Sequence, residues 1–158
     1  MLRKDFAGLF LSIIACEAAG ILGSFFTISS IPTWYASLNK PWFNPPNWLF
    51  GPAWAILYAL MGISLFLAWK KGIKSRQARP ALTAFALQLF LNAAWSIIFF
   101  GLKMPLAAFA EILLLWLSIA AAIALFWRIS RTSALLLVPY LAWVSFAALL
   151  NYSIWVLN

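Results

Sequence analysis

Aromatic and amide side chains recur at helical spacing in three apolar stretches of this sequence. Residues three or four positions apart lie on the same face of a helix. Each of the following groups therefore shares one face: Gln88, Asn92 and Trp95; Trp54, Tyr58 and Met61; and Trp143, Ala147 and Asn151. Indole rings and a few amides are typical of a cavity for a hydrophobic ligand. Hydrogen bonding between packed helices explains the same residues equally well, and the spacing leaves both interpretations open.

Two residue counts exclude several kinds of chemistry. The chain has no histidine, and Cys16 is its only cysteine. These counts exclude a His-ligated zinc or haem site, a Ser-His-Asp or Cys-His catalytic group, and an intramolecular disulfide. We therefore expect no metal site and no resident cofactor. Cys16 is expected to be a small buried packing residue.

Two carboxyl groups, those of Glu17 and Glu111, lie inside apolar stretches. Each is costly in lipid unless it is neutral or has a partner, and neither has a basic residue at matching depth. Glu17 shares a helical face with Gly20, Ser24 and Thr27. For Glu17 we favour close helix packing with a hydrogen bond over a path for a proton or a substrate carboxyl group. For Glu111 both interpretations stay open.

The overall composition is that of a membrane protein. The chain has 158 residues, of which 66% are hydrophobic and 9% charged, and its mean hydropathy is +0.97. A soluble domain carries roughly 25% charged residues, so a soluble enzyme, a secreted disulfide scaffold and a disordered chain are excluded. The net charge of +8 does not indicate nucleic-acid binding, because the basic residues lie in short clusters between apolar stretches.

Five stretches are long enough to cross a bilayer as helices, which takes about 20 apolar residues. They are residues 6–29, 52–69, 81–102, 105–127 and 134–157. We therefore predict an all-α integral membrane protein, a five-helix bundle that forms a single domain over residues 1–158. Pro139 is expected to kink the last helix. Small residues on the third and fourth helices suit close packing, and one of these faces is a candidate homodimer surface.

The basic residues predict the orientation of the bundle. Five spans place nine of the eleven basic residues on one side of the membrane and leave Lys40 and Lys103 on the other. The positive-inside rule then places the N-terminus in the cytoplasm, and the C-terminus and the first loop outside. The cytoplasmic loop over residues 70–79 is expected to anchor the bundle, and its basic side chains suit contacts with anionic lipid headgroups.

The first external loop, residues 33–47, is rich in proline and tryptophan. Pro41, Pro45 and Pro46 fix backbone angles, so the loop has little freedom to lose on becoming ordered. Trp and Tyr also gather at membrane interfaces for general reasons. We favour a structured lid over a plain aromatic belt, because a belt does not need a frame stiffened by proline.

Three motifs of the sequence resemble those of a known family. The first runs from Trp34-Tyr35 through Lys40-Pro41 and Pro45-Pro46 to Trp54, Tyr58 and Met61-Gly62. The second comprises Gln88-Leu89, Leu91-Asn92, Trp95-Ser96 and Phe99-Phe100, and the third runs from Pro139 through Trp143 to Asn151. This pattern resembles the TspO/MBR family, the tryptophan-rich sensory proteins that are also called translocator protein or peripheral benzodiazepine receptor. The resemblance extends from about residue 20 to residue 158.

The resemblance implies a five-helix membrane bundle, commonly a homodimer, with a ligand cavity in its outer half that the first loop closes. Family ligands include porphyrins such as protoporphyrin IX, sterols and synthetic benzodiazepine-type compounds. Matched by motif, the lining residues would be Tyr35, Trp54, Asn92, Trp95, Trp143 and Ala147, with Leu114 and Leu150 as apolar neighbours. Tyr58 and Asn151 join them by helical spacing. No basic residue follows Tyr152, which weakens the case for a sterol and favours a porphyrin.

Four functions are compatible with these expectations. The first is a receptor or sensor that binds porphyrins and related hydrophobic ligands. The second is a transporter of such ligands, although the sequence shows no paired broken helices. The third is an enzyme that degrades porphyrin in light and oxygen, an activity that the resemblance brings, with Trp54 and Trp143 as the candidate catalytic residues. The fourth is a membrane scaffold without a ligand, which leaves the stiff aromatic loop unexplained.

Overall fold

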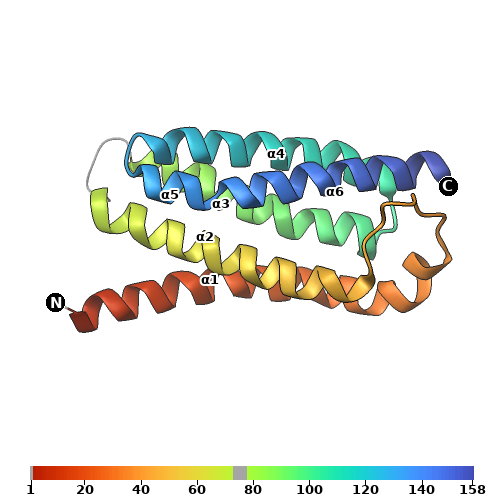
Figure 1. Cartoon of the computed structure of the whole chain (residues 1–158), viewed down its shortest axis with the longest axis horizontal. Helices are drawn as coiled ribbons and strands as arrows, with labels where there is room; N and C mark the ends of the chain where they lie inside the picture. Colours follow the sequence, from red (N-terminus) through yellow and green to blue (C-terminus); the bar gives the residue numbers. More distant parts are fainter. Residues whose placement is uncertain (1, 73–77) are drawn as a thin grey trace.

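The computed structural model describes residues 2–72 and 78–158 of the chain. Its helices lie roughly side by side along one axis, with the two termini at opposite ends (Figure 1). Five of them are long and apolar enough to cross a membrane: Asp5–Tyr35, Asn47–Gly72, Ala78–Gly101, Pro105–Trp127 and Arg131–Leu157. A helix satisfies its backbone hydrogen bonds internally, which lipid requires. The predicted class, an all-α five-helix integral membrane bundle, is confirmed.

The helix boundaries follow the predicted spans closely, with extensions at several ends. The α-helices are α1 (Leu2–Ser30), α2 (Phe50–Gly72), α3 (Ala78–Ser96), α4 (Pro105–Trp127), α5 (Arg131–Leu136) and α6 (Val138–Leu157). Two π-helical turns, η1 (Ile31–Tyr35) and η3 (Ile97–Gly101), extend α1 and α3, and the 3₁₀ turn η2 (Asn47–Leu49) precedes α2. The fourth span begins and ends where predicted.

The fifth span differs most from its prediction. It begins at Arg131 instead of residue 134, because Ser130 caps α5: the Ser133 backbone N–H donates to Ser130 Oγ over 3.4 Å. The span then breaks at Leu137, between α5 and α6. Pro139 causes this break, because it has no N–H to donate and its ring clashes with the carbonyl of the preceding turn. The predicted disturbance is therefore a boundary between two helices.

The loop that follows α1 is shorter than predicted. Helical structure continues through the π-helical turn η1, which contains Pro32 near its start. A proline inside a helix removes one backbone hydrogen bond, and a wider turn accommodates the change. The non-helical part of the first loop, which we call the lid, therefore covers residues 38–46.

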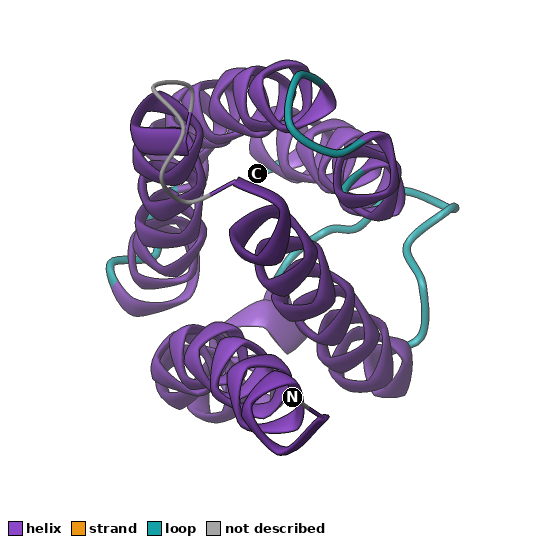
Figure 2. Ribbon diagram, turned by 90° about the vertical axis from the view of Figure 1, so that its left-hand side faces the viewer, coloured by secondary structure: helices purple, strands orange, loops and turns teal. Residues whose placement is uncertain are grey.

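Two apolar clusters form the interior. The larger one extends through the middle of the bundle and toward the α5 end, and it includes Met61, Phe85, Ile119 and Phe126. The smaller one lies near the lid. The main helix pairs are α1 with α2, α3 with α4, and α4 with α6, and Figure 2 shows their arrangement seen along the bundle. Of the five spans, the first is the least buried.

The contact between α1 and α2 depends on glycine. A Cβ at Gly62 would lie 2.5 Å from Ile13 Cα, so the two backbones meet there. Nearer the lid, a Cβ at Gly20 would overlap the Tyr58 ring. Close approach of this kind is typical of helices packed in membranes.

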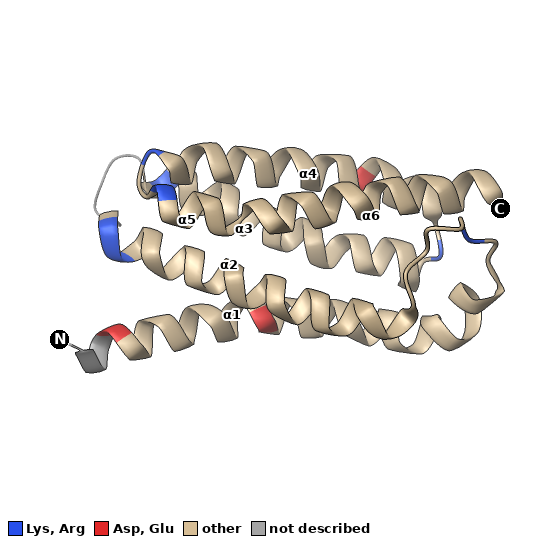
Figure 3. Ribbon diagram, in the orientation of Figure 1, with Lys and Arg blue, Asp and Glu red and all other residues tan. Residues whose placement is uncertain are grey.

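The basic residues that the structure describes lie at the two ends of the bundle, whereas acidic residues also occur along α1 and α4 (Figure 3). Lys70, Lys71 and Arg131 lie at one end, where Lys70 Nζ pairs with Asp5 Oδ2 at 2.9 Å. Lys40 and Lys103 lie at the other end, with the lid. Lys74 and Arg76, which the prediction places in the larger cluster, lie outside the described residues.

Candidate functional site

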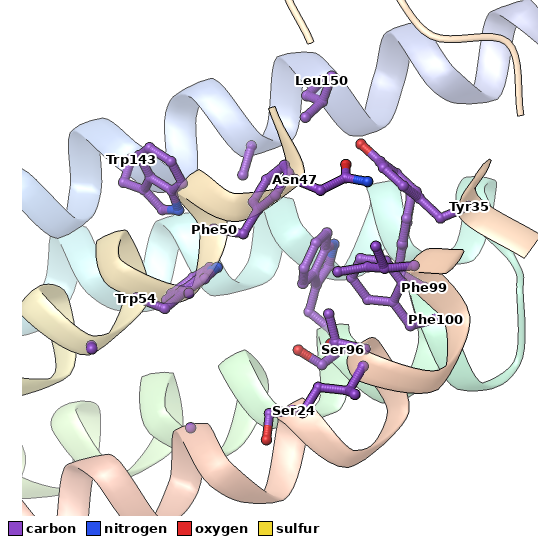
Figure 4. Close-up of a pocket in the computed structure, with 18 of the residues that line it drawn as sticks. Ser24, Tyr35, Asn47, Phe50, Trp54, Ser96, Phe99, Phe100, Trp143 and Leu150 are labelled. Atoms are coloured by element: carbon purple, nitrogen blue, oxygen red, sulfur yellow. The ribbon is translucent and has the colours of Figure 1, made fainter. Parts of the chain in front are cut away.

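A cavity of about 460 Å³ lies beneath the lid. Helices α1, α2, α3 with its extension η3, and α6 all contribute side chains to its lining (Figure 4). This volume is in the range of small-molecule sites, which are mostly apolar clefts with a few placed polar groups.

One wall of the cavity is aromatic and comes from α2 and α6. The ring centroids of Trp54 and Trp143 lie 6.4 Å apart with their planes nearly perpendicular. Phe50 approaches Trp143 at 6.4 Å, and Tyr58 lies 5.7 Å from Trp54 on the deep side. These rings hold one another in fixed orientations, so the wall is preformed.

A second aromatic wall comes from α3, η3 and the end of α1. Trp95 stacks on Phe99 with centroids 5.2 Å apart, and Tyr35 lies 5.8 Å from Phe100. Figure 4 shows Phe99, Phe100 and Tyr35 on the opposite side of the cavity from Trp54 and Trp143. Phe99 and Phe100 are adjacent in sequence and both line the cavity.

A buried hydrogen-bond network closes the deep end. The Tyr58 hydroxyl donates to Asn92 Oδ1, and Asn92 Nδ2 donates to the Tyr140 hydroxyl over 2.9 Å. These three residues join α2, α3 and α6 at the floor of the cavity. Asn92 therefore lies behind Tyr58 and holds it, and Asn92 is not itself among the lining residues.

The polar groups of the lining differ in whether they have partners. Trp95 Nε1 donates to Asn151 Oδ1 over 3.0 Å, and Asn151 Nδ2 donates to the Pro105 carbonyl over 2.8 Å. Within the described residues, the indole N–H groups of Trp54 and Trp143 have no such acceptor. These two donors are available to an acceptor atom of a ligand.

The two membrane carboxyl groups occupy different surroundings. Glu17 lines the cavity, and no hydrogen bond or ion pair joins its carboxyl group to a described residue. The packing hydrogen bond that the sequence favours for Glu17 is therefore not observed. Glu111 is buried outside the cavity lining, and neither of its oxygens has a partner within the described residues.

The lid is held in place at several points. Tyr35 donates from its hydroxyl to Asn44 Oδ1 over 2.6 Å, and Lys40 Nζ donates to the Leu38 carbonyl over 2.9 Å while lying 5.0 Å from the Tyr35 ring centroid. Asn39 exchanges hydrogen bonds with Asn158, and Asn39 Nδ2 donates to the Leu157 carbonyl at the end of α6. These contacts order the first loop, as the prediction of a structured lid requires. Trp42, which is 95% exposed, projects away from it as an interfacial tryptophan would.

One side of the cavity is open between α1 and α2. Ile21 and Ile28 line the cavity, yet they are 57% and 69% exposed, and Gly51 and Ala55 of α2 are exposed as well. Below this level Gly20 and Gly62 bring the two helices together. The opening therefore faces the lipid, at the depth of the cavity.

The structure brings most of the predicted site residues together. The predicted residues that line the cavity are Tyr35, Trp54, Tyr58, Trp95, Trp143, Ala147, Leu150 and Asn151. Asn92 stands behind the floor. Leu114 is not part of the site: it is 58% exposed on α4, and α4 contributes no lining residue.

Several lining residues were not predicted as site residues. Glu17, Gly20, Ser24 and Thr27 form the α1 side, and their common helical face is visible in the sequence. Phe50 is also missed, although the family-like motif includes it. Phe99 and Phe100, in the π-helical turn η3, are also missed, although the second sequence motif includes both. Within the described part of the chain, no cluster of acidic or cysteine side chains suits a metal ion.

Comparison with known proteins gives a consistent result. The sequence model of the TspO/MBR family matches residues 12–156. The chain is 50% identical to the tryptophan-rich protein TspO of Archaeoglobus fulgidus over 147 residues, which cover 93% of this chain and 94% of that protein. It is 40% identical to the human translocator protein over 135 residues, covering 85% and 80% of the two chains. It is 35% identical to the tryptophan-rich sensory protein of Cereibacter sphaeroides over 157 residues, covering 99% and 95%.

Proposed function

The chain belongs to the TspO/MBR family, and from this premise we propose that it is a membrane receptor that binds porphyrins, such as protoporphyrin IX, in the cavity beneath the lid. The names of its relatives, tryptophan-rich sensory protein and translocator protein, support a membrane sensor or transporter role. The porphyrin ligand and the choice of receptor over transporter are the proposal.

The observation that carries the proposal is the pair of aromatic walls. Trp54 and Trp143 on one side and Trp95 and Phe99 on the other border an apolar cavity of about 460 Å³. A flat macrocycle offers each wall a large aromatic face, and such contacts need no metal. Because the chain has no histidine, no imidazole is available to ligate an iron, and a metal-free tetrapyrrole needs no axial ligand.

The acidic edge of a porphyrin would lie toward the lid. No Lys or Arg lines the described part of the cavity, whereas Lys40 lies over the Tyr35 ring at its mouth. The propionate groups would therefore be directed to the mouth, where Lys40 and the solvent reduce the cost of their charge.

Transport is the second candidate, because relatives are named translocator protein. A transporter needs a site that opens to both sides of the membrane in turn. The Tyr58–Asn92–Tyr140 network closes the deep end here, which favours a one-sided receptor site. Transport predicts that protoporphyrin IX trapped inside vesicles leaves faster when the protein is present.

Light-dependent degradation of porphyrin is the third candidate, with Trp54 and Trp143 as its catalytic residues. Both indoles line the same cavity, so a porphyrin bound between the two aromatic walls would lie against them. Illumination in air would then convert the bound porphyrin to a product with a changed spectrum, and Trp54→Phe or Trp143→Phe would abolish the change. Recovery of unaltered porphyrin after illumination would exclude this activity.

Titration of the purified protein with protoporphyrin IX in the dark tests the main proposal. Quenching of Trp fluorescence and the porphyrin absorbance are followed together, with empty micelles as the blank. We expect saturable binding that Trp54→Ala weakens by about fivefold or more, since a buried aromatic contact contributes about 1 kcal/mol. Trp127→Phe, at the far end of α4, is the matched control and should leave binding unchanged. Non-saturable binding that is unchanged by Trp54→Ala would mean that the porphyrin partitions into the micelle, and it would refute the proposal.

We also propose an orientation and an oligomeric state. The gathering of basic residues at one end supports a cytoplasmic N-terminus, with the lid and the C-terminus outside. The homodimer that the family resemblance implies remains a prediction. Of the small residues considered for its interface, Ala81 and Ala108 pack inside the bundle, whereas Ala121 and Ala124 are exposed on α4. The exposed face of α4 is therefore the better candidate surface.

A further inference from the structure

Glu17 differs from every other described side chain that lines the cavity. It is the only acid among them, and no lining side chain is basic. It lies on the middle turns of α1, about 27 Å along the helix axis from Tyr35 at the lid, taking 1.5 Å per residue. The cavity therefore has a carboxyl group at its deep end.

Several polar groups on the α1 side and on the floor of the cavity are already engaged. On the floor, Tyr58 gives its hydroxyl hydrogen to Asn92. On α1, Ser24 donates to the Ile21 carbonyl over 2.7 Å, and Thr27 donates to the Gly23 carbonyl over 3.2 Å. The Glu17 carboxyl group makes no hydrogen bond or ion pair with a described residue, although a carboxyl group has an accepting oxygen in either protonation state.

An unpartnered carboxyl group is costly at this depth of a membrane. In membrane proteins such groups mark the places where ligands and ions bind, because the bound molecule supplies the missing partner. Glu17 lines the cavity, so a molecule bound there can supply the missing partner.

We propose that Glu17 selects ligands that present a hydrogen-bond-donating nitrogen, an amine or a pyrrole-type N–H, to the deep end of the cavity. The inference rests on the proposed function of the site as a receptor for flat aromatic ligands, and it adds the chemical class of the recognised group. The two ends of the cavity then have opposite preferences, because Lys40 at the mouth attracts a ligand acid that Glu17 repels.

Three pyrene derivatives test the inference with the ring system held constant. Pyrenemethylamine carries a donor nitrogen, methylpyrene carries no polar group, and pyreneacetic acid carries an acid. Energy transfer from Trp to pyrene reports binding to the detergent-purified protein, with empty micelles as the blank. We expect the amine to bind about tenfold more tightly than methylpyrene, as a charge-assisted hydrogen bond allows. We expect the acid to bind more weakly than methylpyrene.

Glu17→Gln is the test variant, because the amide nearly matches the carboxyl group in size and should preserve the fold. The amine should lose its advantage over methylpyrene in this variant, and the acid should gain affinity. Asp5→Asn is the matched control: Asp5 is an acid of the same helix that pairs with Lys70 outside the cavity, so its loss should leave the three affinities in their original order.

The outcomes separate this inference from the proposed function. If the ratios among the three affinities are the same in Glu17→Gln as in the parent protein, the proposed role of Glu17 is overturned. Failure of pyrenemethylamine to bind the parent protein would also overturn it. Protoporphyrin IX titrated in parallel reports on the receptor function alone. Saturable porphyrin binding combined with unchanged pyrene ratios would leave the receptor proposal standing and refute the inference.

Discussion

Asn92 contributes to the site without touching the cavity. Its side chain accepts from Tyr58 and donates to Tyr140, so a single amide orients two tyrosines on different helices. Tyr58 in turn supports the Trp54 ring, 5.7 Å away. A residue that the sequence indicates as a ligand contact is thus a positioning residue, and its loss is expected to act first on stability.

Asn92→Ala should lower the free energy of unfolding by about 1–2 kcal/mol. The substitution leaves two buried hydroxyl groups without their partner, which costs more than the loss of one exposed bond. Thermal unfolding in detergent, followed by circular dichroism, measures the change.

Ser145→Ala provides the comparison for this prediction. It removes an exposed hydrogen bond, that from Trp116 Nε1 to Ser145 Oγ at 2.8 Å, on the lipid side of the bundle. A destabilisation by Ser145→Ala equal to that of Asn92→Ala would show that burial of the Asn92 network is not what makes it important.

Residue types and helical spacing predict most of the residues that line the cavity, but they do not define the complete set. Eight of the ten predicted residues line the cavity, and seven of these eight project from regular α-helices. Leu114 fails because an apolar side chain in a membrane helix suits the lipid side as well as the interior. Phe100 is missed because helical spacing from the polar residues of α3 selects Gln88, Asn92 and Trp95 and does not extend to the π-helical turn η3.

At the scale of the elements, α1 and α2 form a pair that is closed at one end and open at the other. Gly62 lets α1 approach so closely that Ile13 backbone atoms take the space of a side chain. Gly51, near the lid, has nothing within 4 Å of the position a Cβ would occupy. The two glycines thus distinguish the packed half of the pair from its open half.

Gly62→Ala should destabilise the bundle by about 1–3 kcal/mol, because the neighbouring atoms belong to a backbone that cannot rotate away. Gly51→Ala adds the same methyl group where space is free, and it should be neutral or stabilise the helix by up to about 1 kcal/mol. Unfolding of both variants in the same detergent gives the comparison. Equal effects of the two substitutions would contradict the close contact at Gly62.

Helix boundaries could be predicted where an apolar run fills the membrane span. They could not be predicted near a proline that lies within a span. The fourth span, Pro105–Trp127, begins and ends at the predicted residues because a proline starts it and an apolar run fills it. A proline within a helix can be accommodated by a wider turn, as at Pro32, or by a break between two helices, as at Pro139. Tertiary packing, and not the local sequence, decides whether a wider turn or a helix break forms.

At the scale of the whole molecule, the bundle is polarised along its axis. The end that carries Lys70, Lys71 and Arg131 is strongly basic, and the lid end has Lys40 and Lys103 (Figure 3). The cavity and its lid lie at the less basic end. In the orientation proposed above, the ligand site would belong to the outer half of the membrane.

Cysteine labelling tests this orientation in intact cells. In a Cys16→Ser background, Ser37→Cys next to the lid should react with a membrane-impermeant maleimide added outside. Arg128→Cys, at the opposite end of the bundle, should react only after the membrane is permeabilised. The reverse pattern would place the basic end outside and invert the predicted topology.

Because the cavity opens between α1 and α2, a ligand can enter it directly from the bilayer. A hydrophobic molecule dissolved in the acyl chains reaches Ile21 and Ile28 by diffusion in two dimensions, without returning to water. The concentration that the opening meets is the concentration of the molecule in the membrane. This concentration equals the aqueous concentration multiplied by the partition coefficient. Occupancy then depends on the ratio of ligand to lipid. Two compounds with identical contacts inside the site will therefore differ in apparent aqueous affinity by the ratio of their partition coefficients.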